Sequence, residues 1–327
     1  MRILFYGTKP YDRIWFEPMA KDYGYEITFL EAQCNVDTVF LAKGYDAICI
    51  FINDTVDKEM IKRLYRNGVR AILLRSAGFN HVDLKAAKDK LKILRVPSYS
   101  PQAVAEYAMA MALTVNRFTH RAYTRTREFN MSINGLMGRD FYHKCAGIIG
   151  TGKIGQAMAA ICKGFGMHVV AYDPFPNKEL PVEYLSLDEL LARADLISLH
   201  CPLTNDTRYI INEDTISKMK KGVLLVNTSR GGLIHTEALV DGLLAGKFAG
   251  VGLDVYEEED GLFYEDRSGD IIEDDMLARL MTFPNVLVTS HMGFFTKEAM
   301  QSIAIDTLEN AYMLEHDLPL INEVKAD

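Results

Sequence analysis

The sequence has no excess of positive charge. Its 327 residues include 36 Lys and Arg against 44 Asp and Glu, which gives a formal net charge of −8 at pH 7. Proteins that bind nucleic acid neutralise phosphates with Lys and Arg and usually carry a basic surplus. Nucleic acid is therefore not expected among the partners of this chain.

Paired cysteines are also missing. The five cysteines are scattered, and none forms a C-x-x-C pair or a spacing typical of a zinc site. Cys49, Cys145 and Cys201 lie within or beside apolar runs, as small buried side chains do in a reducing compartment. We expect neither a disulfide framework nor a bound metal.

No hydrophobic run is long enough to cross a membrane. The longest Ala- and Met-rich stretch, residues 107–115, is far shorter than the ~20 residues that span a bilayer. The first twelve residues contain one basic residue, a short apolar stretch and then turn residues, which favours a first strand over a signal peptide. These features predict a cytoplasmic protein with no membrane partner.

The sequence does contain many short apolar runs, each followed by a stretch with helical spacing. Such runs are typical of parallel strands that are buried on both faces, and their alternation with helices predicts an α/β protein with two doubly wound parallel sheets. At roughly 150 residues per domain, the length also predicts two domains. The strands are expected at about 2–6, 25–30, 46–51, 70–74, 92–96, 146–150, 168–172, 195–199, 222–227, 249–254 and 285–289.

Two helices stand out. One is expected from Gln102 to about Thr126, entered through Tyr99-Ser100-Pro101, and its apolar middle should be covered on most sides. Its far end carries arginines at four-residue spacing, which form either a solvated or subunit-facing stripe or an anion-steering surface; these are Arg117, Arg121 and Arg125. The second helix, Lys297 to Leu314, is amphipathic and should dock on a sheet.

A G-x-G-x-x-G pattern falls on Gly150, Gly152 and Gly155, directly after an expected strand and at the start of a helix. In the dinucleotide fingerprint these glycines allow a tight turn, leave room for the pyrophosphate and let the helix approach the sheet. Asp173, 18 residues further on, would accept hydrogen bonds from the adenosine ribose and repel the extra phosphate of NADP. The pattern predicts NAD as cofactor; a glycine-rich turn that binds nothing, or a flavin site, are the alternatives.

Three later strand ends carry polar side chains. Arg230 ends one strand, carboxylates crowd residues 254–259 after the next, and His291 follows a third. Ligands bind at the carboxyl ends of parallel strands, where an arginine fork can hold a carboxylate bidentately. A basic anchor, a carboxylate and a histidine together indicate a hydride-transfer site.

With these residues in place, the chain resembles the D-isomer-specific 2-hydroxyacid dehydrogenases, and within that family the fermentative D-lactate dehydrogenases. The resemblance covers essentially the whole chain in one collinear order, although Asp260 stands where many members have proline. It is carried by LRSAGFNHVDL (74–84), VPSYSPQAVAEYA (96–108), GTGKIG (150–155), SLHCPLT (198–204), VNTSRG (226–231), LDVYEEE (253–259) and LFYEDRSGDIIEDD (262–275).

The resemblance implies a catalytic mechanism. His291 would give its proton to the carbonyl oxygen of a 2-oxo acid as the nicotinamide delivers hydride to C2. Glu259 would orient the imidazole and favour its charged form, whereas Glu257 and Glu258 would be merely solvated. Arg230 would hold the substrate carboxylate. His200, which also follows a strand, is expected to be a supporting residue rather than a catalytic one.

The resemblance also implies the remaining binding residues. The N–H groups of Ala77 and Gly78 would meet the substrate carboxylate, Tyr99 would reach it from a hinge, and Phe294 would flank the methyl side; Tyr99 and Phe294 could instead be plain packing residues. The cofactor would be bound by the three glycines and Asp173 together with Lys153, Ile154, Cys201, Pro202, Thr207, Thr228 and Asp254.

The resemblance implies a domain division as well. Residues 1–99 and 296–327 would form a discontinuous, flavodoxin-like substrate-binding domain, and residues 100–295 a Rossmann-type NAD-binding domain. The apolar helix after Pro101 suggests a homo-oligomer, either a dimer or a tetramer. Three functions are considered: reduction of pyruvate to D-lactate, reduction of another small 2-oxo acid such as glyoxylate, hydroxypyruvate or a branched acid, and dinucleotide sensing by a corepressor-like binding protein.

Overall fold

The computed structural model describes residues 1–259 and 261–326; Asp260, where the sequence departs from the family pattern, lies outside the described residues. The chain divides into two compact units. Unit 1 comprises Met1–Ser100 and the segment from Phe295 onward, and unit 2 comprises Pro101–Phe294.

Unit 1 contains a parallel sheet with the strand order β2-β1-β3-β4-β5. This is the flavodoxin-like order, so the predicted fold of this unit is confirmed. Parallel pairing is regular across the sheet, as in the alignment of Leu74 with Arg95 between β4 and β5. The strands are β1 (Arg2–Phe5), β2 (Glu26–Phe29), β3 (Ala47–Ile50), β4 (Ala71–Leu74) and β5 (Lys92–Arg95).

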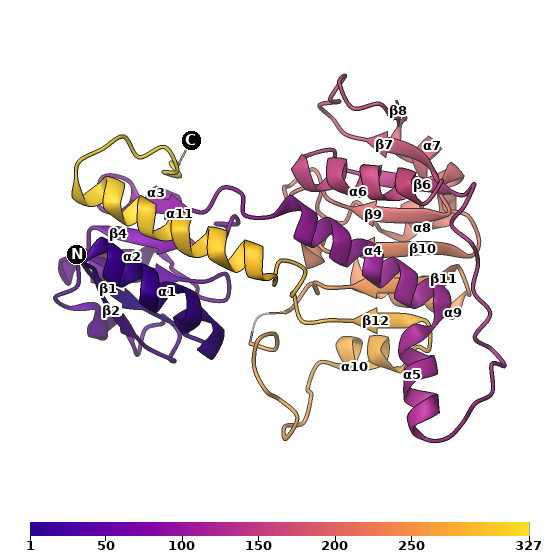
Figure 1. Cartoon of the computed structure of the whole chain (residues 1–327), viewed down its shortest axis with the longest axis horizontal. Helices are drawn as coiled ribbons and strands as arrows, with labels where there is room; N and C mark the ends of the chain where they lie inside the picture. The colour runs from indigo at the N-terminus through magenta and orange to yellow at the C-terminus, as the bar shows by residue number, and fades with distance from the viewer. Residues whose placement is uncertain (260, 327) are drawn as a thin grey trace. The chain divides into compact units, whose positions relative to one another are not determined.

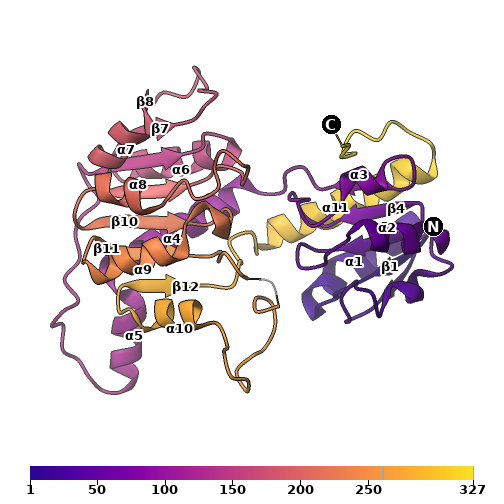
Figure 2. The ribbon, with the colours of Figure 1, turned by 180° about the vertical axis from the view of Figure 1, so that it is seen from behind.

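Helices cover both faces of this sheet. Helices α1 and α11 pack against each other on one face, while α2 and α3 lie with η1 on the other (Figures 1 and 2). Because both faces are covered, β3 and β4 are buried along their whole length, which explains their unbroken apolar sequences. The helical elements are α1 (Pro10–Tyr23), η1 (Val39–Ala42), α2 (Lys58–Arg66), α3 (Leu84–Ala87) and α11 (Lys297–Glu315).

Unit 2 contains a second parallel sheet with the order β12-β11-β10-β9-β6-β7-β8. Counted along the unit, this is the Rossmann order 3-2-1-4-5-6 with one more strand, and the strand order reverses between β6 and β9. The predicted Rossmann-type fold is thus confirmed. The strands are β6 (Cys145–Ile149), β7 (His168–Tyr172), β8 (Glu183–Tyr184), β9 (Leu196–Leu199), β10 (Val223–Asn227), β11 (Phe248–Leu253) and β12 (Val286–Val288).

The sheet of unit 2 also lies between two helical layers. Alternate side chains of one strand enter opposite cores: Leu224 and Val226 pack with α4 and α6, whereas Leu225 packs with α7, α8 and α9. Figures 1 and 2 show these layers in turn. The helical elements are α4 (Pro101–Arg117), α5 (Thr119–Arg127), α6 (Lys153–Gly164), α7 (Leu187–Arg193), α8 (Glu213–Lys218), η2 (Gly231–Leu233), α9 (Thr236–Leu244) and α10 (Asp275–Thr282).

The long helix expected from Gln102 to Thr126 is interrupted. Phe118 has a left-handed backbone (φ 53°), which separates α4 from α5, so the arginine stripe does not run along one continuous helix. Nη1 of Arg125 instead donates to the carbonyls of Ser132 and Asn134 in the following segment. Within residues 1–259 and 261–326, no helix combines the length and the apolarity needed to cross a bilayer.

Candidate active site

The predicted dinucleotide turn connects β6 to α6. Gly150 has φ +91°, and a Cβ there would lie 2.5 Å from the backbone nitrogen of Cys201. A Cβ on Gly155 would lie 2.0 Å from the carbonyl oxygen of Gly150. Both positions therefore require glycine, the first because the turn passes close to the end of β9 and the second because the helix packs against its own entry turn.

The first turn of α6 is open to an anion. Gly152 precedes the helix and provides no side-chain cap, and a Cβ at this position would meet no atom within 4 Å. The first N–H groups of a helix lack intrahelical partners, so those of Lys153 and Ile154 are available to phosphate oxygens at the positive end of the helix dipole. This geometry fits a dinucleotide pyrophosphate.

Asp173 lies just past the end of β7 and is tied to the same turn. Its Oδ2 accepts hydrogen bonds from the backbone nitrogen of Thr151 at 2.7 Å and from the Thr151 hydroxyl at 2.9 Å. Its Oδ1 accepts from the backbone nitrogen of Phe175 at 2.9 Å. The carboxylate therefore braces the glycine turn, in addition to the predicted contact with the ribose.

The other predicted cofactor residues follow β9 and β10. Cys201 is buried, which raises the pKa of its thiol to about 11, and its carbonyl accepts a hydrogen bond from the Ser229 hydroxyl. Thr207 donates to the carbonyl of Pro202 at 2.6 Å. The hydroxyl of Thr228 is buried and has no hydrogen-bond partner among the described residues, which fits a polar group of a bound dinucleotide.

His291 and Glu259 are brought into direct contact. Nδ1 of His291 lies 2.8 Å from Oε1 of Glu259, and the two side chains are 12% and 20% exposed. Nε2 of His291 makes no hydrogen bond within the described part of the chain. A carboxylate on one ring nitrogen fixes the orientation of an imidazole and leaves the other nitrogen for proton transfer.

The backbone at His291 is held by Asp254. His291 has φ 54°, a left-handed conformation that histidine tolerates better than most residues, and its N–H donates to the carbonyl of Asp254. The Asp254 carboxylate accepts from the Thr289 hydroxyl and from the backbone nitrogens of Met292 and Gly293. Burial raises the pKa of this carboxyl, and about one of its roughly four acceptor positions is left for a ligand.

Arg230 stands at the carboxyl end of β10 with its charge uncommitted. Its Nη1 donates to the carbonyl of Ser229 at 2.7 Å, and no carboxylate of the described residues lies within ion-pair distance of its guanidinium. A Cβ on the next residue, Gly231, would lie 2.0 Å from the carbonyl group of Tyr256. This backbone contact sets Arg230 beside the loop that carries Glu259, a relation that the R-G-G sequence does not by itself specify.

Glu257 and Glu258 are expected from the sequence to be solvated, and His200 is expected to be a supporting residue. Glu258 is exposed, as expected, but the expectation for Glu257 is wrong because its carboxylate accepts hydrogen bonds from the hydroxyls of Tyr209 and Thr236. Nε2 of His200 lies 2.8 Å from the Ser198 hydroxyl, and burial lowers the pKa of His200 to about 4. His200 is therefore neutral at pH 7.

Unit 1 carries the remaining predicted substrate residues. Ala77 and Gly78 follow β4, Tyr99 follows the adjacent strand β5, and all three are half-buried. The carbonyls of Ala77 and Gly78 accept hydrogen bonds, whereas their N–H groups donate to no group in the described part of the chain. Phe294, the last residue of unit 2, is 9% exposed.

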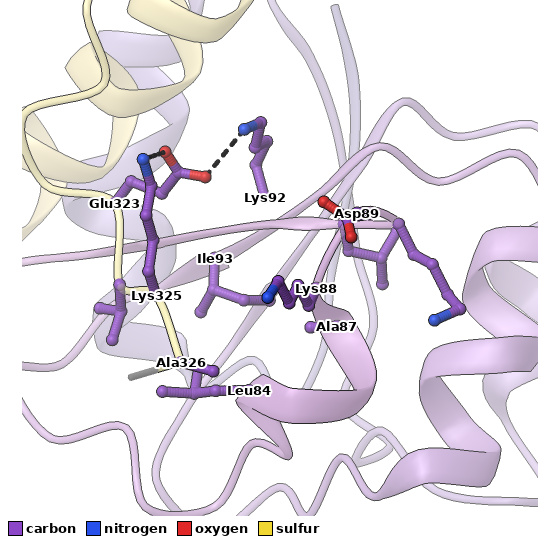
Figure 3. A pocket seen from close by; sticks show the side chains of 12 residues that line it. Leu84, Ala87, Lys88, Asp89, Lys92, Ile93, Glu323, Lys325 and Ala326 are labelled. Carbon is purple, nitrogen blue, oxygen red and sulfur yellow. Dashed lines mark hydrogen bonds and ion pairs between the residues drawn. The ribbon is translucent and has the colours of Figure 1, made fainter.

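A cavity of about 490 Å³ in unit 1 lies away from these residues. It adjoins Lys92 at the amino end of β5, and Figure 3 shows Glu323 there between Lys92 and Lys325, with nitrogen–oxygen distances of 2.9 and 3.3 Å. None of the predicted site residues lines it. The predicted site residues instead follow the carboxyl ends of the strands.

Comparisons with known proteins place these features in a family. Residues 109–293, more than half of the chain, match the NAD-binding domain of the D-isomer specific 2-hydroxyacid dehydrogenases. The chain is 50% identical to 2-hydroxyacid dehydrogenase A of Aspergillus oryzae over 316 residues, which cover 95% of the chain and 91% of that protein. It is 47% identical to D-lactate dehydrogenase of Escherichia coli over 328 residues, 99% of the chain and 100% of that protein.

A similarity in structure agrees with these matches. The solved structure of the pyruvate reductase of Chlamydomonas reinhardtii superimposes with a TM-score of 0.93 at 44% identity and covers 98% of both chains. The fold and the matches define an NAD-dependent oxidoreductase. The chain belongs to the D-isomer specific 2-hydroxyacid dehydrogenase family.

The close contact at Gly231 makes a specific prediction. Gly231→Ala should lower kcat/KM for 2-oxo acid reduction at least ~10²-fold, because the new methyl group would push Arg230 away from the loop of Tyr256 and Glu259. Gly164→Ala is the matched control. It should leave the rate unchanged, because a Cβ at Gly164 would meet no atom within 4 Å. Steady-state kinetics of NADH oxidation compare the two variants, and an unaffected Gly231→Ala enzyme would show that this contact does not govern the site.

Proposed function

We propose that this enzyme reduces pyruvate to D-lactate and catalyses the reverse reaction. The observation that carries the proposal is the His291–Glu259 pair, in which Nε2 of His291 has no hydrogen-bond partner among the described residues. Arg230 adds a guanidinium that has no carboxylate partner in the same part of the chain. The proposal is supported by relatives named D-lactate dehydrogenase and pyruvate reductase. Another small 2-oxo acid is the alternative substrate, because the same groups would serve any acid of this class.

His291 acts as the general acid of the reduction. NADH, when bound, supplies the hydride that adds to C2 of the 2-oxo acid. Nε2 of protonated His291 transfers its proton to the carbonyl oxygen as the C–O double bond becomes the hydroxyl of the product. Glu259, on Nδ1, holds the ring in place and stabilises its positive charge during binding. In the reverse direction, neutral His291 removes the hydroxyl proton.

Arg230 and unit 1 bind the carboxylate. The Arg230 guanidinium is a planar double donor without a carboxylate partner in the described residues, so it suits an incoming carboxylate. In unit 1, the N–H groups of Ala77 and Gly78 donate to no group among the described residues and are further candidate donors for a substrate carboxylate. Tyr99 contributes at the carboxylate, and Phe294 limits the size of the substrate side chain.

The residues around the glycine turn bind NAD. Gly150, Gly152 and Gly155 shape the turn, and the first N–H groups of α6 at Lys153 and Ile154 contact the pyrophosphate. Asp173 selects NAD over NADP by its charge. The remaining residues contribute along the adenosine, ribose and nicotinamide; they are Cys201, Pro202, Thr207, Thr228 and Asp254.

A panel of 2-oxo acids tests the substrate. Pyruvate should give the highest kcat/KM with NADH when compared with glyoxylate, hydroxypyruvate and 4-methyl-2-oxopentanoate, and chiral chromatography should find D-lactate as the product. A higher kcat/KM for the branched acid would overturn the lactate assignment while leaving the dehydrogenase class in place. No NADH oxidation with any of the acids would favour a dinucleotide-sensing role.

The substitution His291→Gln tests the proton transfer. The variant should bind NADH with unchanged Kd, measured by fluorescence titration, and lose at least ~10²-fold in kcat because no group donates the proton. His316→Gln, at a histidine on the exposed end of α11, serves as the matched control and should keep full activity. A His291→Gln enzyme with near-normal kcat would remove the acid–base role.

We also propose that the chain forms a homo-oligomer through residues 128–138. The apolar helix that suggested an interface, α4, is instead covered by α6, β10 and β11 of its own unit. The segment after α5 exposes Phe129, Ile133 and Met137 at 88%, 83% and 91%. Arg125 binds two carbonyls of this segment, so its apolar side chains are presented on a fixed backbone, a feature typical of a protein interface.

Sedimentation velocity tests this surface. The wild-type chain should sediment as a multiple of its 36.9 kDa mass, and Ile133→Asp should shift it toward the monomer, since a buried unpaired charge opposes association. Ile321→Asp, at a 74% exposed isoleucine of unit 1, should not change the mass. A wild-type monomer at micromolar concentration would refute the proposal.

A further inference from the structure

The loop after β4 contains two backbone donors, the N–H groups of Ala77 and Gly78. Their directions are fixed by hydrogen bonds to the carbonyl groups of the same two peptide units. The carbonyl of Ser76 accepts a hydrogen bond from the backbone nitrogen of Val96 at 3.2 Å, and the carbonyl of Ala77 accepts one from Nη1 of Arg95 at 3.1 Å. A trans peptide group is planar, and its C=O and N–H point in opposite directions. Holding these two carbonyls therefore aims the N–H groups of Ala77 and Gly78 away from β5.

Arg95 is placed for this contact by the sheet itself. It pairs in register with Leu74, the last residue of β4, so its side chain emerges beside the loop that begins at Arg75. Its guanidinium also lies over the ring of Phe79, 5.2 Å from the ring centroid. One side chain thus contacts the loop at two points, on either side of Gly78.

The backbone of Arg95 is in turn held by the last part of the chain. Its N–H donates to the carbonyl of Asn322 at 3.2 Å, and its carbonyl accepts from Nδ2 of Asn310 at 2.9 Å. The two asparagines are joined by a hydrogen bond of 2.9 Å, and Asn310 on α11 is 2% exposed. A shift of the Arg95 backbone would therefore break these partly buried hydrogen bonds.

We infer that Arg95 is a positioning residue for substrate binding: by holding the carbonyl of Ala77 it aims the N–H of Gly78 at the substrate carboxylate. This inference rests on the proposed role of Ala77 and Gly78. In this role Arg95 acts through the loop and not on the substrate itself, because it holds the peptide plane that carries the N–H of Gly78. Binding of the acid therefore depends on a side chain behind the loop, while the hydride and proton transfers do not.

The test is the substitution Arg95→Met, which keeps the length of the side chain and removes its donors. The KM for pyruvate should rise about tenfold, with kcat and the Kd for NADH changed less than about twofold. Arg95→Lys, which can still donate to Ala77 but cannot match the planar contact with Phe79, should recover part of the loss. Lys92→Met removes a charge from the same strand and should leave KM unchanged.

Binding without turnover separates this role from a general loss of stability. Oxamate, an isostere of pyruvate that accepts no hydride, is titrated into the enzyme–NADH complex and followed by NADH fluorescence. Its Kd should rise by the same factor as KM in Arg95→Met. An unchanged KM and oxamate Kd, or an equal loss in NADH binding and kcat, would overturn the inference.

A failure of the proposed function would give a different result from a failure of the inference about Arg95. If the wild-type enzyme does not reduce pyruvate, the proposed substrate is wrong, and the comparison is made with the 2-oxo acid that the enzyme does reduce, since that acid carries the same carboxylate. If the wild-type enzyme is active and Arg95→Met retains the wild-type KM, only the role of Arg95 is wrong.

Discussion

The parallel direction of every strand is the constraint on which this structure depends. Because β10, β11 and β12 run the same way, the residues that follow them gather at one edge although they are distant in sequence. This places Arg230, the loop of Glu259 and the turn of His291 at the same edge of the sheet. The same rule places Gly150 beside Cys201, where the strand order reverses between β6 and β9.

Two contacts to the polypeptide backbone fix the segments that carry His291 and Arg230 at that edge. The turn of His291 is held by a buried carboxylate, Asp254, that accepts hydrogen bonds from two of its amides. Gly231 brings the strand end of Arg230 against the carbonyl of Tyr256. Both contacts fix polypeptide backbone, which is stiffer than a side chain and so suits groups whose angles matter for catalysis.

The two parallel sheets and the glycine turn could be predicted from the sequence because they depend on local pattern. That the ends of β10, β11 and β12 lie at one edge follows from a general rule of parallel sheets. The break at Phe118 could not be predicted, since nothing local favours a left-handed backbone at phenylalanine. Strand β8 has two residues and is too short to show periodicity. The partners of Glu257 and the three donors on Asp254 are long-range contacts that one sequence does not reveal.

The hydrogen bonds from Val96 and Arg95 to the loop after β4 bear on which residues of this enzyme can be substituted. The donors at positions 77 and 78 are main-chain groups, so a change of side chain at position 77 does not remove them. Their direction is specified elsewhere, at Val96 and Arg95 and through Arg95 at Asn310 and Asn322. On the proposed role of this loop, the recognition of an acid would depend partly on Asn310 and Asn322, which are far in sequence from residues 77 and 78.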